Sequence, residues 1–153
     1  MLENHPKSKF TIWCYNFKEG EEIPEIHGHG SKGNKIPKLS IGPPPHGTKT
    51  IALIMDDPDA RAVTPDGKVW DHWLFYDIIT TPKQDRVEGK NSWGEIGYGG
   101  PEPPDKEHTY IFRAYALDEE LDLKEGYSKQ ELKDAISKVR ILAKAELTGT
   151  YAP

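Results

Sequence analysis

The chain has 153 residues and a formal net charge of −5, with 35% hydrophobic and 29% charged residues. This length suits one domain with a sizeable core, so we expect a single domain over residues 1–153. The acidic balance and the lack of a Lys/Arg cluster argue against nucleic acid as the main partner.

The first ten residues and the cysteine content predict the cellular compartment of the protein. Residues 1–10, MLENHPKSKF, lack the apolar stretch of a signal peptide, and no apolar run reaches the roughly 18 residues of a membrane span. The single cysteine, Cys14, has no partner for an internal disulfide, which favours a reducing compartment. We therefore expect a cytoplasmic protein that does not cross a membrane.

Short segments rich in β-branched and aromatic residues predict strands in chain order at Phe10–Phe17, Thr50–Met55, Trp73–Ile79 and Tyr110–Leu117. Thr50–Met55 is apolar throughout, which is typical of a strand buried on both faces. Gly- and Pro-rich segments at 28–47 and 89–104 predict loops between these strands.

A late segment predicts an amphipathic helix. Ser128 and Glu131 have the spacing of a capping box, in which each side chain binds a backbone N–H at the helix start. Gly149 stands where a left-handed C-cap would end the helix. Between them, one apolar stripe follows at three- and four-residue steps: Leu132, Ala135, Ile136, Val139, Leu142, Ala143 and Leu147. We therefore expect a mostly β domain with this helix packed on a sheet.

The acidic segment Met55–Trp73 suggests a metal loop, catalytic carboxylates, or turns that use aspartate. An EF-hand is excluded because Arg61 takes a ligand position and Ala62 replaces the required glycine. His72 and His108 suit a transition metal, but neither lies in a short ligand-spaced motif, so a structural role is favoured. A paired-carboxylate hydrolase needs a fixed distance between carboxyl groups, which sequence does not supply.

Nucleophilic catalysis has little support in the sequence. There is no Gly-x-Ser-x-Gly elbow, and the glycines around Tyr98 lack the Gly-Lys-Ser/Thr of a phosphate-binding loop. Cys14 lies in a hydrophobic strand pattern, where a cysteine is usually a small core residue. We therefore assign no catalytic residue, no metal ligand and no cofactor.

Four motifs occur in order along the chain: DPDA at 57–60, DHW at 71–73, GYGGPEPP at 97–104 and HTY at 108–110. Together they resemble the signature of the phosphatidylethanolamine-binding protein family, also called the Raf kinase inhibitor protein family. The likeness is greatest to its short bacterial and archaeal branch, the YbhB/YbcL-like proteins, and extends over roughly residues 10–151.

The resemblance implies a large antiparallel β-sheet packed against a smaller one, with a helix near the C-terminus. It also implies a small pocket at one end of the sheet that binds an anion such as phosphate or a phospholipid headgroup. Carried over by motif, the candidate pocket residues are Asp57, Asp59, Trp70, His72, Gly100, Pro101, His108 and Tyr110.

These residue types suit an anion in several ways. Histidine rings, the Tyr110 hydroxyl and a glycine-rich nest of backbone N–H groups are hydrogen-bond donors. Asp57 would raise the pKa of a neighbouring histidine and orient its ring. It would not contact the anion directly, because a carboxylate that faces phosphate would repel it. Asp59 serves equally well as a turn cap, and Trp70 and Tyr110 as core aromatics.

The chain departs from the family pattern at four positions: Arg61, Glu102, Lys106 and Thr109. Arg61 stands where proline is usual, so we expect a looser loop or a cation at the pocket rim. Lys106 replaces a common glycine and Glu102 a common cysteine, while Thr109 is expected to point away from the pocket.

The leading hypothesis is a non-enzymatic protein that binds a small anion or phosphorylated headgroup. The first alternative is an inhibitor of a serine protease or kinase, with the Pro-rich loop 42–47 as a docking surface. The remote alternative is a hydrolase that uses His72 or His108 with Asp57. The sequence leaves open whether the chain forms a homodimer.

Overall fold

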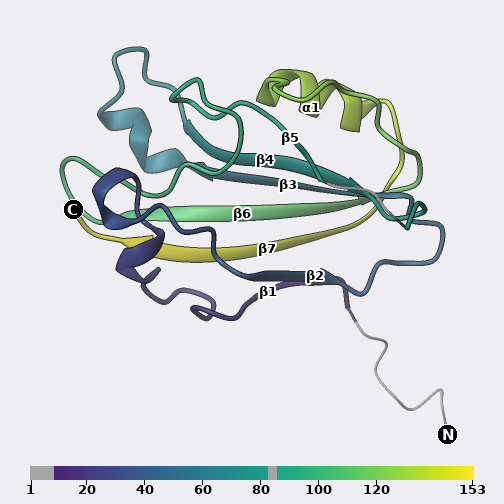
Figure 1. The fold of residues 1–153 in the computed structure, drawn as a ribbon, viewed down its shortest axis with the longest axis horizontal. Helices are drawn as coiled ribbons and strands as arrows, with labels where there is room; N and C mark the ends of the chain where they lie inside the picture. The colour runs from purple at the N-terminus through teal and green to yellow at the C-terminus, as the bar shows by residue number, and fades with distance from the viewer. Residues whose placement is uncertain (1–8, 83–85) are drawn as a thin grey trace, which may run out of the picture.

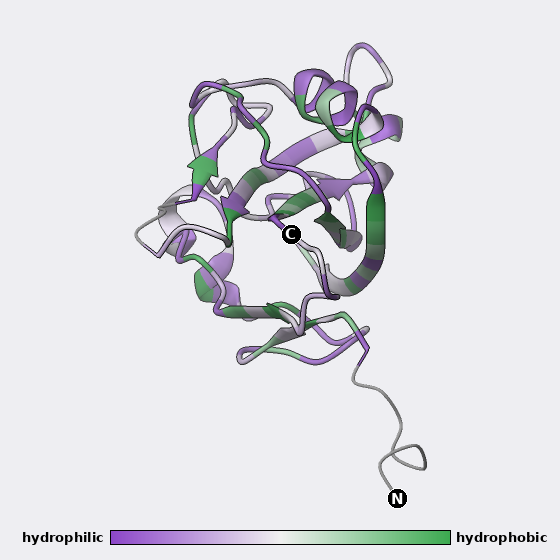
Figure 2. Cartoon of the chain, turned by 90° about the vertical axis from the view of Figure 1, so that its right-hand side faces the viewer, coloured by the Kyte–Doolittle hydropathy of each residue, from purple (hydrophilic) through white to green (hydrophobic). Residues whose placement is uncertain are grey.

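The computed structural model describes residues 9–82 and 86–153, and its elements form three layers (Figure 1). The middle layer is a five-stranded antiparallel sheet in the order β5-β4-β3-β6-β7. The two-stranded sheet of β1 and β2 lies against one face, and the helix α1 lies over the other (Figures 1 and 2). The expected mostly β fold of a large and a small antiparallel sheet is confirmed.

The strands are β1 (Thr11–Cys14), β2 (Leu39–Gly42), β3 (Thr50–Asp57), β4 (Trp70–Ile78), β5 (Val87–Glu88), β6 (His108–Leu117) and β7 (Ile141–Tyr151). The helical segments are α1 (Lys129–Ser137) and three 3-10 turns, η2 (Glu25–His27), η3 (Gly30–Lys32) and η4 (Pro58–Ala62). All four predicted strands are present, whereas β2, β5 and β7 were not predicted. Residues 1–8, on which the expectation of no signal peptide partly rests, lie outside the described residues.

The predicted helix begins as expected but ends much earlier. Ser128 and Glu131 form the capping box, and the helix ends at Ser137. The prediction of a helix up to Gly149 is wrong, because residues 141–151 form β7 and pair along the whole length of β6. The apolar residues of this segment fit both the helical and the strand period. Pairing with the backbone N–H and C=O groups along the edge of β6 favours the strand.

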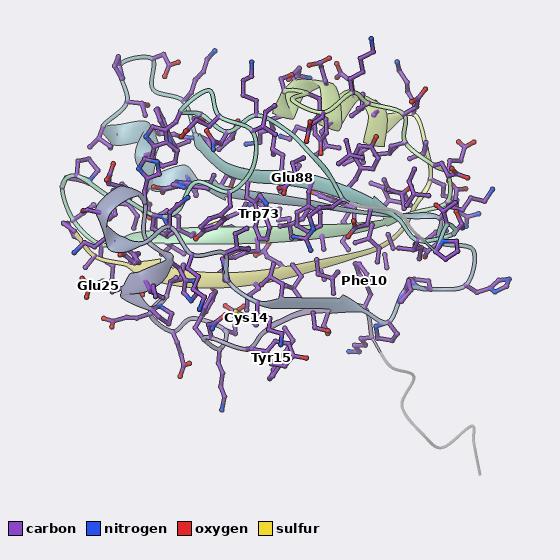
Figure 3. The ribbon with its side chains drawn as sticks, viewed as in Figure 1. Phe10, Cys14, Tyr15, Glu25, Trp73 and Glu88 are labelled. Atoms are coloured by element: carbon purple, nitrogen blue, oxygen red, sulfur yellow. The ribbon has the colours of Figure 1, made fainter. Side chains whose placement is uncertain are left out.

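Two cores hold the layers together. One lies between the sheets and includes Phe10, Cys14 and Trp73, which Figure 3 labels. The other lies between the large sheet and α1 and includes Leu132 and Ile136 of the helix. Because successive strand residues point to opposite faces, each central strand contributes to both cores. In the part of the chain that the structure describes, no helix is long and apolar enough to span a membrane.

Candidate functional site

A cavity of about 200 Å³ lies at the end of the large sheet where β3 ends and β4 and β6 begin. Five of the eight candidate residues line it: Asp57, Trp70, His72, His108 and Tyr110. The remaining lining residues were not predicted: Ala60, Val63, Thr64, Pro65, Trp93, Glu102 and Pro104. Strand ends from distant parts of the sequence therefore converge on one site.

A bulge in β4 directs His72 to the cavity and its neighbour Asp71 to the opposite face of the sheet. Met55 of β3 pairs with Trp73 and Asp56 pairs with Asp71, so His72 is an extra residue on β4. Such an insertion reverses the alternation of faces beyond it. Asp71 consequently faces Lys129 at the start of α1, and His72 lies edge-on to the Tyr110 ring at 5.1 Å between ring centroids.

His108 lies between two carboxylates. Its Nδ1 lies 2.6 Å from Asp57 Oδ2 and its Nε2 lies 2.7 Å from Asp105 Oδ1, and the ring is only 1% exposed. Burial lowers the pKa of His108, but the hydrogen bonds to Asp57 and Asp105 outweigh it, and the pKa is raised. Both ring nitrogens lie against carboxylate oxygens, an arrangement that favours the doubly protonated ring, while burial raises the pKa of its partner Asp57.

His72 is oriented by backbone instead of by a carboxylate. Its Nδ1 lies 2.7 Å from the carbonyl oxygen of Gly99 and 3.1 Å from that of Gly100. A carbonyl only accepts, so Nδ1 carries the proton. Burial lowers the pKa of His72 to about 4, despite the hydrogen bonds to these carbonyls that raise it. At neutral pH the ring is therefore uncharged, and Nε2 is an acceptor, which corrects the expectation that His72 donates to an anion.

Three buried polar atoms of the cavity make no hydrogen bond of good geometry within the described residues: Asp57 Oδ1, Trp70 Nε1 and Tyr110 Oη. Tyr110 nevertheless lies close to Asp57, and burial together with this carboxylate raises the pKa of the phenol. Asp57 is 3% exposed and Tyr110 is fully buried. A buried polar group without a partner costs about 1–3 kcal/mol, so such groups concentrated in one cavity indicate a site for a ligand. Their types are mixed, because Asp57 accepts, Trp70 donates and Tyr110 does either.

Gly100, Pro101 and Asp59 do not line the cavity. Gly100 donates its N–H to Asn34 Oδ1 at 2.7 Å, and Gly99 donates to the His72 carbonyl oxygen at 2.8 Å. The expected glycine nest is therefore not available to an anion. A Cβ on Gly100 would overlap the His27 carbonyl oxygen, so the glycine permits close backbone packing.

Asp59 and Pro101 have structural contacts instead. The Asp59 carboxylate accepts from the backbone N–H of Thr109 at 2.8 Å and so ties η4 to the start of β6. The Pro101 carbonyl accepts from the His29 N–H at 2.9 Å. These contacts fix the wall segments around the cavity.

Trp93 and Glu102 complete the rim, and sequence reasoning missed both. Trp93 stacks on His29 at 3.8 Å between ring centroids and lies edge-on to Trp70 and His72. Glu102 lies 3.5 Å from His29 and is 60% exposed at its side chain. Both belong to the Gly- and Pro-rich segment 89–104, and Glu102 lies within the motif at 97–104, so their closeness to that motif was the available signal.

Arg61 does not lie at the rim of this cavity. It belongs to η4 and lines a different cavity on the other face of the sheet. The expectation that Arg61 would favour anions at the predicted pocket is therefore wrong. Among residues 9–82 and 86–153, no group of three His, Cys, Asp or Glu side chains is arranged to hold a metal ion.

Comparison of the chain with known proteins identifies its family. The family model described as phosphatidylethanolamine-binding protein matches residues 14–152. The chain belongs to the phosphatidylethanolamine-binding protein family. A UPF0098 protein of Chlamydia muridarum is 40% identical over 142 residues, which cover 88% of this chain and 93% of that protein.

Two solved structures of family members share the fold. A homologue from Chlamydia trachomatis is 38% identical, with a TM-score of 0.81 and coverage of 94% of this chain and 97% of that one. Escherichia coli YbcL is 28% identical, with a TM-score of 0.78 and coverage of 94% and 98%. The expected likeness to short YbcL-like members of the family is confirmed.

Proposed function

We propose that the cavity binds a small oxyanion that also carries a hydrogen-bond donor, such as monoanionic phosphate or a phosphoethanolamine headgroup. We propose further that the protein binds this ligand without chemical turnover. The observation that carries the proposal is the mixed set of buried atoms without partners, two of which can donate and at least one of which only accepts.

The donors suit the oxyanion. Trp70 Nε1–H and the Tyr110 hydroxyl are buried, so hydrogen bonds from them to a charged oxygen would satisfy two groups that lack partners. Hydrogen bonds to a charged acceptor contribute about 1.5–3 kcal/mol each, roughly twice the neutral value.

The acceptors suit a ligand that is not fully ionised. Asp57 Oδ1 and the unprotonated Nε2 of His72 offer lone pairs, not protons. A phosphate dianion facing Asp57 would be repelled, whereas a P–OH or an ammonium group would donate to it. The ligand therefore needs both an anionic oxygen and a proton to give.

The size of the cavity limits the ligand to a headgroup. Its volume of about 200 Å³ is smaller than the roughly 300–1,000 Å³ of pockets that enclose drug-sized ligands. Any acyl chains of a lipid would therefore lie outside it.

The lining supports binding over catalysis. Among the described residues that line the cavity, Thr64 is the only one besides Tyr110 with a hydroxyl or thiol, and its hydroxyl donates to the Lys68 carbonyl oxygen at 2.9 Å. A nucleophile activated by His72 would need to lie within hydrogen-bond reach of its Nε2. Phosphoester turnover that disappears in His72→Ala would revive the hydrolase alternative. That the protein inhibits a serine protease or a kinase stays a prediction, which inhibition assays would test.

Isothermal titration calorimetry with three probes tests the proposal. Inorganic phosphate and phosphoethanolamine carry both an anionic oxygen and a donor, whereas dimethyl phosphate carries no donor. We expect the first two to bind about tenfold or more tightly than dimethyl phosphate. The affinity for both should fall from about pH 6 to pH 8, because each phosphate gains a second negative charge. It should fall less for phosphoethanolamine, whose ammonium can face Asp57.

Tyr110→Phe is the matched variant, because it removes one unpartnered hydroxyl and keeps the ring. Loss of about tenfold in affinity with unchanged or increased stability is the expected result. Equal affinity for all three probes, or an unchanged affinity in Tyr110→Phe, would contradict the proposal.

A further inference from the structure

A second cavity, of about 260 Å³, lies on the opposite face of the same end of the sheet and is lined by residues of η4 and the start of α1. Asp56 and Asp57 are neighbours on β3, and alternation sends Asp57 to the first cavity and Asp56 to the second. The charged residues that line the second cavity are Asp56, Arg61, Arg113, Lys129 and Lys133. Four cations and one acid face this space, in a chain whose net charge is −5.

The buried Asp56 and the partly buried Asp71 hold two of the cations in place. Asp56 is 5% exposed and accepts from Arg113 Nη1 at 3.2 Å and from Lys129 Nζ at 2.8 Å. Lys129 Nζ also donates to Asp71 Oδ1 at 2.8 Å. Burial lowers the pKa of Lys129, but the hydrogen bonds to the two aspartates outweigh it, and the pKa is raised, so the ammonium stays charged.

Donors remain on these held cations. A lysine ammonium has three N–H groups, and the structure uses two of those on Lys129. An arginine has five in a planar fork, and Arg113 uses Nη1 towards Asp56 and Nε towards Glu146 at 3.5 Å, a partner whose side chain is 57% exposed. The second terminal nitrogen of Arg113 stays unused within the described residues.

Two further cations at the cavity have no acidic partner among the described residues. Arg61, from η4, and Lys133, one turn along α1 from Lys129, form no ion pair there. Ile54, Pro58, Val69 and Tyr115 supply the apolar walls. Fixed cations with spare donors beside unpaired mobile ones make a site for a multiply charged oxyanion.

We propose that this cavity is a second ligand site, which binds a polyvalent phosphoryl group through Arg61, Arg113, Lys129 and Lys133. It differs from the first cavity in requiring no proton on its ligand, because it presents cations where the first presents acceptors. The two sites are back to back across β3 and share η4, which contributes Ala60 to the first and Arg61 to the second.

Inorganic pyrophosphate, followed by ¹H–¹⁵N NMR at neutral pH and about 0.1 M salt, tests this site separately from the first. We expect saturable shifts at Arg61, Arg113, Lys129 and Lys133 amides. Acetate, which carries a single charge, should not produce them. The double variant Arg61→Glu with Lys133→Glu should weaken pyrophosphate at least about tenfold and leave phosphoethanolamine binding at the first cavity unchanged.

Lys49→Glu is the matched control for charge reversal. Lys49 precedes β3 at its other end, about 20 Å from Asp56 and beyond a Debye length in ordinary buffer. If Lys49→Glu weakens pyrophosphate binding as much as the double variant does, or if the shifts do not saturate, the attraction is non-specific and the site is wrong. Failure of phosphoethanolamine binding in the wild type would refute the first site without affecting this one.

Discussion

His72 gives its one proton to backbone carbonyls and keeps an unprotonated nitrogen for the cavity, so its charge state matters to stability as well as to binding. Sequence reasoning placed His72, His108, Asp57, Trp70 and Tyr110 at one site, through family motifs. It also anticipated a hydrogen bond between Asp57 and a histidine, which His108 makes. It did not anticipate Asp105, although this residue is only three positions before His108. It also did not anticipate that His72 stays neutral, because its tautomer and charge depend on the distant Gly99 and Gly100 carbonyls and on burial.

The first prediction concerns acid stability. Burial lowers the folded-state pKa of His72 to about 4, against an ordinary value of 6.5. As pH falls below about 6.5, the unfolded chain takes up a proton that the folded protein refuses, so the stability contributed by neutral His72 is lost. Between about pH 6.5 and pH 4, the wild type should lose about 3 kcal/mol more unfolding free energy than His72→Gln.

Urea unfolding across this pH range measures the difference. His46→Gln is the control, because His46 is exposed and forms no hydrogen bond in the described part of the chain. It should follow the wild type. If His72→Gln also follows the wild type, the ring is not held neutral in the folded protein.

At the scale of elements, β7 and the β4 bulge determine the site and escape sequence analysis. The apolar pattern of 141–147 fits a helix and a strand, so only pairing with β6 decides between them. The bulge at His72 leaves no mark in composition, yet it directs Asp71 to α1 and His72 to the cavity. By contrast, the capping box at Ser128 was predictable, since its residues are local.

Gly149 tests the strand assignment. A Cβ there would lie 2.7 Å from side-chain atoms of Ile23 and Phe17, and the backbone is not in the left-handed region. We therefore expect Gly149→Ala to lower the unfolding free energy by about 1–3 kcal/mol and Gly149→Asn to lower it further. A left-handed C-cap would rank the variants the other way, because asparagine tolerates that conformation better than alanine. Urea unfolding of both variants separates the two assignments.

For the whole molecule, net charge is a poor guide to its surfaces. The chain is acidic overall, yet one end of the large sheet carries a cavity rich in acceptors on one face and a cavity rich in cations on the other. The fold class and the first cavity were predictable because ordered motifs resemble a family. The second cavity was not, because Arg61, Arg113 and Lys133 lie far apart in sequence and meet only through the sheet and α1.

The central claim is that the first cavity binds an oxyanion which also donates a hydrogen bond. A crystal structure of the phosphoethanolamine complex tests it most directly. We predict phosphate oxygens within hydrogen-bond distance of Trp70 Nε1 and Tyr110 Oη, with the ammonium facing Asp57 Oδ1 or His72 Nε2. An empty first cavity at saturating ligand, or phosphoethanolamine found only beside Arg61 and Lys133, would contradict the claim.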